Sequence, residues 1–107
     1  PLEYPNIGSV FKNVPVASLP ASLKDSLRHI VKEDPFPVVP TAYLISEAGL
    51  KGVSFGGAMI SPKHPNFIVN VQDATAFDID SLIFLVKEEV KNKFGVLLEQ
   101  EVERVSS

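Results

Sequence analysis

The sequence predicts an α+β domain, in which helices pack on one face of a small mixed sheet of about four strands. One segment, Ala76 to Phe94, repeats apolar residues every three or four positions, as an amphipathic helix does. Other segments alternate apolar and polar residues or are rich in β-branched and aromatic residues, as strands are. Because strands and helices do not alternate strictly, a parallel βαβ sheet is disfavoured. The chain of 107 residues has the length of one domain.

Three segments are expected to form helices. The longest, Ala76 to Phe94, is preceded by Thr75, which together with the acidic residue three positions later forms a weaker version of the capping box. Gly95 is expected to end it in the left-handed conformation. Shorter helices are expected from Tyr43 to Ala48 and between Pro20 and Asp34, before a proline-rich connector.

Four segments are expected to form strands: Gly8–Val14, after a glycine turn, Val53–Ile60, Phe67–Val71 and Val96–Val105. A tight six-residue connection joins the second and third segments, which favours a hairpin. The pair Gly56-Gly57 inside the second segment indicates a bulge or a close approach of another group to the backbone. In the last segment, alternation places three glutamates on one face.

Composition excludes several classes of function. The net charge of −3 has the wrong sign for a surface that binds nucleic acid. The chain has no cysteine, and His29 and His64 are isolated, so we expect neither disulfides nor a metal site. No apolar run is long enough for a membrane helix, and the first ten residues do not resemble a secretion signal. The sequence contains neither GxxxxGK[ST] nor GxGxxG after a strand, the familiar nucleotide-binding loops.

Four short motifs follow one another along the chain: GSVFKN at 8–13, AGLKG at 48–52, GGA with SPKH at 56–64, and LEQEV at 98–102. In this order they resemble the C-terminal, substrate-binding domain of the UDP-N-acetylenolpyruvoylglucosamine reductases. These are flavoenzymes of the second committed step of bacterial peptidoglycan synthesis. The resemblance extends from about Tyr4 to Val105, which is nearly the whole chain.

The resemblance implies that residues 1–107 are one domain of a cytoplasmic oxidoreductase that serves cell-wall biogenesis and thereby cell shape and division. In this family FAD takes hydride from NADPH and passes it to UDP-N-acetylglucosamine enolpyruvate, which becomes UDP-N-acetylmuramate. The FAD-binding domain would lie in sequence preceding Pro1 and would be the partner of this domain. We therefore expect the chain alone to be inactive and not to retain flavin.

The resemblance also implies roles for four residues. Ser9 matches the serine that gives a proton to the carbon beside the substrate carboxylate, and Glu101 matches the catalytic glutamate. A neutral hydroxyl suits proton donation, and a nearby acid or charge suits stabilisation of the enolate-like intermediate. Asn13 and His64 match positions that contact substrate, where an amide or imidazole can donate to an anionic group.

Each of these residues also has an ordinary interpretation. Ser9 follows a glycine, as turn serines do, Glu101 fits a solvated strand face, and His64 fits an exposed loop. The alternative functions are a stand-alone module that binds a nucleotide sugar or a protein without chemistry, and a purely structural domain. Lys12 is less favoured for binding than Asn13, because strand alternation would point it to the opposite side.

The segment Val14 to Val39 is longer than the matching connection in compact members of the family. It follows directly after Asn13. We expect this insertion to pack beside the substrate channel as a lid or brace.

Overall fold

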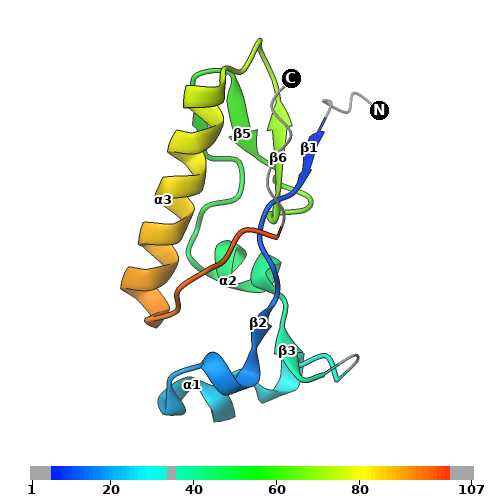
Figure 1. The fold of residues 1–107 in the computed structure, drawn as a ribbon, viewed down its shortest axis with the longest axis vertical. Helices are drawn as coiled ribbons and strands as arrows, with labels where there is room; N and C mark the ends of the chain where they lie inside the picture. The colour runs from blue at the N-terminus through cyan, green and yellow to red at the C-terminus, as the bar shows by residue number, and fades with distance from the viewer. Residues whose placement is uncertain (1–5, 34–35, 102–107) are drawn as a thin grey trace.

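A computed structural model describes residues 6–33 and 36–101, and it confirms the α+β class. Figure 1 shows an upper body, in which one long helix lies beside a sheet, and a lower lobe around a short helix. The molecule is elongated, with extents of 41 × 27 × 27 Å. Its elements in chain order are β1 (Asn6–Ser9), β2 (Val14–Pro15), the 3₁₀ turn η1 (Val16–Ser18), α1 (Ala21–Ser26), the 3₁₀ turn η2 (Arg28–Ile30), β3 (Val38–Val39), α2 (Thr41–Glu47), β4 (Ser54–Phe55), β5 (Ala58–Ile60), β6 (Phe67–Asn70) and α3 (Ala76–Phe94).

The main sheet has four strands in the order β1-β6-β5-β4, and all its pairings are antiparallel, so the expectation of a mixed sheet was wrong in this detail. Short connections join β4 to β5 and β5 to β6, and such connections only allow antiparallel neighbours. The β5–β6 pairing confirms the hairpin expected from the six-residue connection. β2 and β3 form a separate two-stranded sheet.

β1 begins before the glycine that was expected to form a turn. Asn6 pairs with Val69 and Gly8 pairs with Ile68, so β1 carries one residue more than β6 between these two pairs. This extra residue makes a β-bulge, which bends the strand as it leads into Ser9. Gly8 therefore lies inside the strand, at an irregularity of the ladder.

The expected strand Val53–Ile60 is two strands, β4 and β5, which pair with each other around Gly56 and Gly57. Gly56 has a φ of +56°, which a glycine adopts without cost. A Cβ atom on Gly57 would lie 1.9 Å from the carbonyl oxygen of Gln72. The close approach expected at the glycine pair is confirmed at Gly57, and the approaching group is the protein's own backbone.

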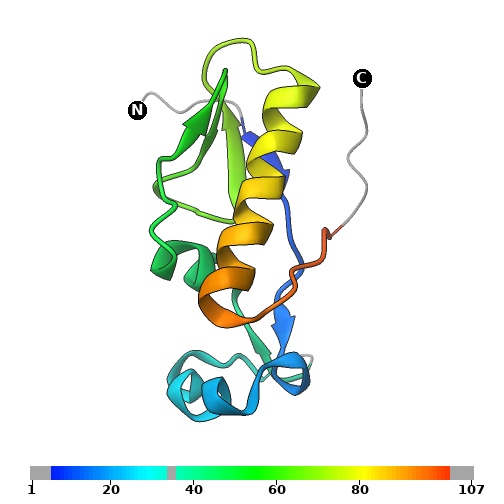
Figure 2. The ribbon, with the colours of Figure 1, turned by 90° about the vertical axis from the view of Figure 1, so that its left-hand side faces the viewer.

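The helix α3 has the bounds that its pattern predicts. The hydroxyl of Thr75 accepts from the backbone N–H of Asp78, and the Asp78 carboxylate accepts from the N–H of Thr75, which completes a capping box. Gly95 ends the helix with a φ of +70°. Figure 2 shows α3 lying across one face of the sheet. Its inward side is fully buried in the core through Leu82, Ile83, Val86 and Val90.

The helix expected between Pro20 and Asp34 is much shorter, because it consists of α1 followed by η2. Leu27 separates the two and is only 5% exposed, so the chain turns there to bury its side chain. Neither piece has a side-chain cap at its start. Asp34 lies outside the described residues.

Within residues 96–101, the described part of the segment expected as the strand Val96–Val105, there is one isolated bridge, between Gln100 and Phe11. Its alternation holds in burial, because Val96 and Leu98 are buried whereas Leu97 is exposed. Among the described residues, backbone hydrogen bonds join this segment to Val10 and Lys12. Residues 102–105 lie outside the described part.

Exposed aromatic side chains gather between β4 and the outer side of α3. Phe55, Phe77 and Phe84 are each more than 40% exposed, and the rings of the first two lie 5.7 Å apart. These rings form an exposed apolar patch on this side of the molecule. None of the described helices is long and apolar enough to cross a membrane.

Candidate functional site

The two ends of the described chain meet at the short segment that follows β1. The N–H of Val10 donates to the carbonyl of Asn66 at 2.9 Å on one side. On the other side, the N–H of Lys12 donates to the carbonyl of Glu99, and the N–H of Glu101 donates to the carbonyl of Val10, both at 2.8 Å. These bonds place residues from opposite ends of the sequence on adjacent backbones.

Ser9 and Glu101 come together through this arrangement. The Ser9 Oγ lies 3.3 Å from Glu101 Oε1 in a hydrogen bond that spans 92 residues of sequence. Both side chains are exposed. The pair that the motifs single out is therefore adjacent in space and open to a ligand.

Asn66, in the β5–β6 connection, is a third member of this group. Its Nδ2 donates to Ser9 Oγ at 3.2 Å and to the carbonyl of Phe11 at 2.9 Å. Its Oδ1 accepts from the N–H of Phe11 at 3.1 Å. The sequence alone does not distinguish this residue, because asparagine is an ordinary turn residue.

Asn13 is oriented by the start of α2. Its Oδ1 accepts from the N–H of Thr41 at 3.1 Å, and the Thr41 hydroxyl donates to the carbonyl of Lys12 at 2.6 Å. Thr41 is completely buried, so its hydrogen bonds to Asn13 and to the Lys12 backbone are anchored in the core. Because a backbone N–H requires an oxygen opposite it, the amide nitrogen of Asn13 is turned outward, with two protons to donate.

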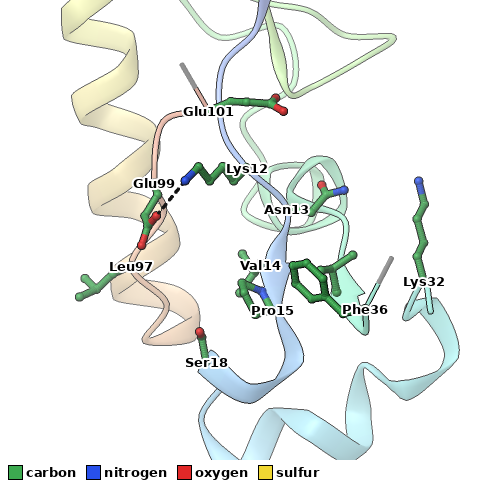
Figure 3. Close-up of a pocket in the computed structure, with 11 residues that line it drawn as sticks. Lys12, Asn13, Val14, Pro15, Ser18, Lys32, Phe36, Leu97, Glu99 and Glu101 are labelled. Carbon is green, nitrogen blue, oxygen red and sulfur yellow. Dashed lines mark ion pairs between the residues drawn. The ribbon is translucent and has the colours of Figure 1, made fainter. Parts of the chain in front are cut away.

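An open pocket of about 750 Å³ adjoins these residues. Figure 3 shows its lining, which combines side chains from residues 97–101 with side chains from residues 12–38. The lining residues are Lys12, Asn13, Val14, Pro15, Ser18, Lys32, Phe36, Val38, Leu97, Glu99 and Glu101. The insertion at 14–39 therefore forms one wall of the pocket that contains Asn13 and Glu101.

Lys12 lines the same pocket as Asn13, and Figure 3 shows the two side chains pointing to opposite sides of the segment that carries them, as strand alternation predicts. The Lys12 Nζ lies 3.6 Å from Glu99 Oε1, an exposed ion pair that leaves the ammonium group accessible.

His64 is exposed in the β5–β6 connection and does not line this pocket. Its ring contacts Phe67 edge-on at 6.0 Å, and Phe67 pairs with Ser9 across the sheet. His64 therefore lies at the same end of the sheet as Ser9. The structure brings Ser9 and Glu101 into contact and places Asn13 in the same pocket lining as Glu101, whereas His64 lies outside that lining.

The glycine pair has no room for a bound phosphate. Gly57 is closed by the Gln72 backbone, and the position where Gly56 would carry a Cβ lies 2.3 Å from the Asp78 carboxylate. A phosphate-binding glycine loop needs backbone that a ligand can approach. These glycines therefore do not fit the diphosphate of a flavin dinucleotide.

Comparison with known proteins agrees with the motifs. Residues 1–105 match the family model for the C-terminal domain of UDP-N-acetylenolpyruvoylglucosamine reductase. The chain is 43% identical over 105 residues to the reductase of that name from Chloroherpeton thalassium, covering 98% of this chain and 29% of the relative. It is 44% identical over 102 residues to the reductase from Nitrosospira multiformis, covering 95% and 23%. The chain thus spans less than a third of these curated relatives.

A solved structure is similar as well. The crystal structure of UDP-N-acetylenolpyruvylglucosamine reductase from Thermus caldophilus superposes with a TM-score of 0.56 at 33% identity. The match covers 92% of this chain and 26% of that one. The family model, the sequence relatives and the fold agree, and this chain belongs to the UDP-N-acetylenolpyruvoylglucosamine reductase family, whose C-terminal domain it matches.

Proposed function

We propose that this chain is the substrate-binding and proton-donating domain of a cytoplasmic enzyme that reduces UDP-N-acetylglucosamine enolpyruvate to UDP-N-acetylmuramate. The observation that carries the proposal is the hydrogen bond between Ser9 and Glu101. It joins the two residues that match the family's proton donor and catalytic glutamate, although 92 residues separate them in sequence. The family relationship supports the same reaction.

The reduction adds a hydride to the methylene carbon of the enolpyruvyl group and a proton to the carbon beside its carboxylate. FAD, reduced by NADPH, supplies the hydride when it is bound. Because the glycine pair of this chain does not fit a dinucleotide, we assign FAD binding to the remaining length that the relatives have. This chain supplies the proton and the contacts to the anionic substrate.

Ser9 is the proton donor in this proposal. Its hydroxyl is exposed, as access to a substrate carbon requires. Glu101 accepts the Ser9 hydrogen bond and lies at the edge of the pocket, where it can hold or return a proton and organise charge around the intermediate. Both roles depend on the contact between the two side chains.

The pocket offers hydrogen-bond donors to an anionic substrate, next to the carboxylates of Glu99 and Glu101 in the same lining. The Asn13 amide presents two N–H protons, and Lys12 and Lys32 add two ammonium groups to the lining. Amide and ammonium groups are donors for carboxylate and phosphate oxygens. His64, at the same end of the sheet as Ser9, adds a further donor outside this lining, and the insertion at 14–39 acts as a brace that forms one wall.

The test is Ser9→Ala in the complete enzyme, followed in its two half-reactions. We expect reoxidation of the reduced flavin by substrate to slow by about 100-fold or more, the usual contribution of a general acid. Reduction of the flavin by NADPH should change by less than twofold. Equal loss in both half-reactions, or no loss in the first, would remove Ser9 from the proton-donor role.

A matched control is Ser22→Ala. Ser22 is an exposed serine of α1 that does not line the pocket. Both half-reactions should be unchanged in this variant. Flavin content and the thermal unfolding midpoint of both variants report whether the fold is intact.

A further inference from the structure

We propose that Asn66 is a positioning residue that holds Ser9 in place and sets the direction of its hydroxyl proton. The inference rests on the proposed function, because it assumes that Ser9 donates that proton. Asn66 does not line the pocket described above, and its contribution acts through Ser9.

The orientation of the Asn66 amide follows from the backbone of one residue, Phe11. The N–H of Phe11 points at one end of the amide at 3.1 Å, and the carbonyl of Phe11 receives the other end at 2.9 Å. Only one assignment satisfies both contacts, with Oδ1 facing the N–H and Nδ2 facing the carbonyl. The reverse assignment would set a donor against a donor and an acceptor against an acceptor.

This orientation decides what Ser9 can do. The second proton of Asn66 Nδ2 points at Ser9 Oγ, 3.2 Å away, and an amide nitrogen only donates. Ser9 Oγ must therefore accept this bond, so its own proton is directed elsewhere. The one acceptor that the structure shows for that proton among the described residues is Glu101 Oε1, at 3.3 Å.

The result is a relay with one direction, from the Asn66 amide to the Ser9 hydroxyl and on to Glu101 or to a substrate atom at that position. The backbone of Asn66 is itself held in place, because its carbonyl accepts a hydrogen bond from the N–H of Val10. Its side chain uses both donors and its oxygen, so it has little freedom to turn. A donated hydrogen bond also stabilises the alkoxide that Ser9 becomes when it loses the proton.

The test is a double-mutant cycle of Asn66→Ala with Ser9→Ala in the complete, flavin-loaded enzyme. In the wild-type background, Asn66→Ala should slow reoxidation of the flavin by substrate about tenfold, through misplacement of the donor. In the Ser9→Ala background, the same change should have less than a twofold effect, because no hydroxyl remains to be positioned. If the rate reductions of the two single variants multiply in the double variant, Asn66 does not act through Ser9. That result would overturn the inference and leave the role of Ser9 intact.

Failure of the proposed function would look different. If Ser9→Ala alone leaves reoxidation unchanged, the proton-donor role fails and the positioning role fails with it. The matched control is Asn70→Ala, which removes an asparagine at the end of the adjoining strand β6, where its Oδ1 accepts from the N–H of Ala74. It should leave reoxidation within twofold of wild type.

A second variant keeps the inference testable if Asn66→Ala does not fold. Asn66→Asp retains an oxygen for the Phe11 N–H but replaces the donor to Ser9 with an acceptor. The Ser9 proton should then turn toward the introduced carboxylate, and reoxidation should slow at least tenfold at pH 7 and recover as acid protonates that carboxylate. A variant with wild-type reoxidation at pH 7 would overturn the inference.

Discussion

Two carboxylates of this domain show how differently the same chemical group is used. Asp78 accepts hydrogen bonds from the backbone N–H groups of Thr75 and Gly57, at 3.0 and 3.1 Å. Glu101 accepts a bond from the side chain of Ser9, its one side-chain hydrogen bond among the described residues, and it is exposed. The Asp78 carboxylate has a structural role, because its hydrogen bonds join the start of α3 to the β4–β5 turn. The second retains acceptor capacity for a ligand, which is why the proposed chemistry is placed there.

The largest effect that would sharpen this comparison is expected at Glu101. Glu101→Gln keeps the shape and an acceptor for Ser9 but removes the charge. Turnover of the complete enzyme should fall by about 100-fold, while the free energy of unfolding should change by no more than about 0.5 kcal/mol, as for exposed residues. Steady-state kinetics and denaturant unfolding measure the two quantities.

The control for that variant is Glu47→Gln, an exposed glutamate at the end of α2 that is outside the pocket. It should change neither turnover nor stability. If Glu101→Gln retained full turnover, the distinction between the two carboxylates would be wrong.

The next largest effect is expected on stability, at Gly57, whose N–H donates to the structural carboxylate Asp78. An alanine Cβ would lie 1.9 Å from the Gln72 carbonyl oxygen, so the backbone must shift and stability should fall by about 2 kcal/mol. Gly52→Ala is the control, because it has a φ of +79° but open space around its Cβ position. It should cost about 1 kcal/mol. Urea unfolding of the chain compares them, and equal losses would show that crowding is unimportant.

A smaller, pH-dependent effect is expected at Asp78. Hydrogen bonds from the backbone of Thr75 and of Gly57 lower the pKa of Asp78 below its ordinary value of 3.8, because they stabilise the charged form. A group with a lowered folded-state pKa stabilises the protein above its unfolded-state pKa. That contribution is lost as the pH falls through the folded-state pKa.

Asp78→Asn should therefore destabilise the chain most at neutral pH. The difference from wild type should shrink below about pH 4, where the carboxyl of the unfolded chain begins to take up protons. Thermal unfolding midpoints between pH 2 and pH 7 test this. A difference that grows on acidification would have the wrong sign.

The smallest effect is expected for the ion pair between Lys12 and Glu99. Its atoms are 3.6 Å apart and both side chains are more than half exposed, so solvent screens the attraction. A double-mutant cycle with alanine at both positions should give a coupling energy below about 0.5 kcal/mol. A coupling of several kcal/mol would mean that this glutamate, like Asp78, is part of the fold.

The sequence predicted those parts of the fold that local pattern determines. The helix α3 was predicted to the residue, because its apolar period, its Thr75 cap and Gly95 all agree. The turn at Gly56-Gly57 was missed, since its strands are too short to show alternation. The length of α1 was overestimated because burial of Leu27, a tertiary effect, ends it.

The candidate site was only partly accessible to sequence reasoning. Ser9, Asn13 and Glu101 were singled out by resemblance to the family, whereas periodicity indicates nothing about a contact between positions 9 and 101. That contact depends on backbone bonds between distant segments. Asn66 was missed, because a turn asparagine carries no distinctive signal. Lys12 was ranked below Asn13, and it lines the pocket although its side chain points away from that of Asn13.

The most direct test of the central claim is a double-mutant cycle of Ser9→Ala and Glu101→Gln, read as the rate at which substrate reoxidises the reduced flavin of the complete enzyme. If the hydroxyl and the carboxylate work as one unit, the double variant should be no slower than the slower single variant. If the two losses multiply, the side chains act independently, and the hydrogen bond between them does not carry the function proposed for this domain.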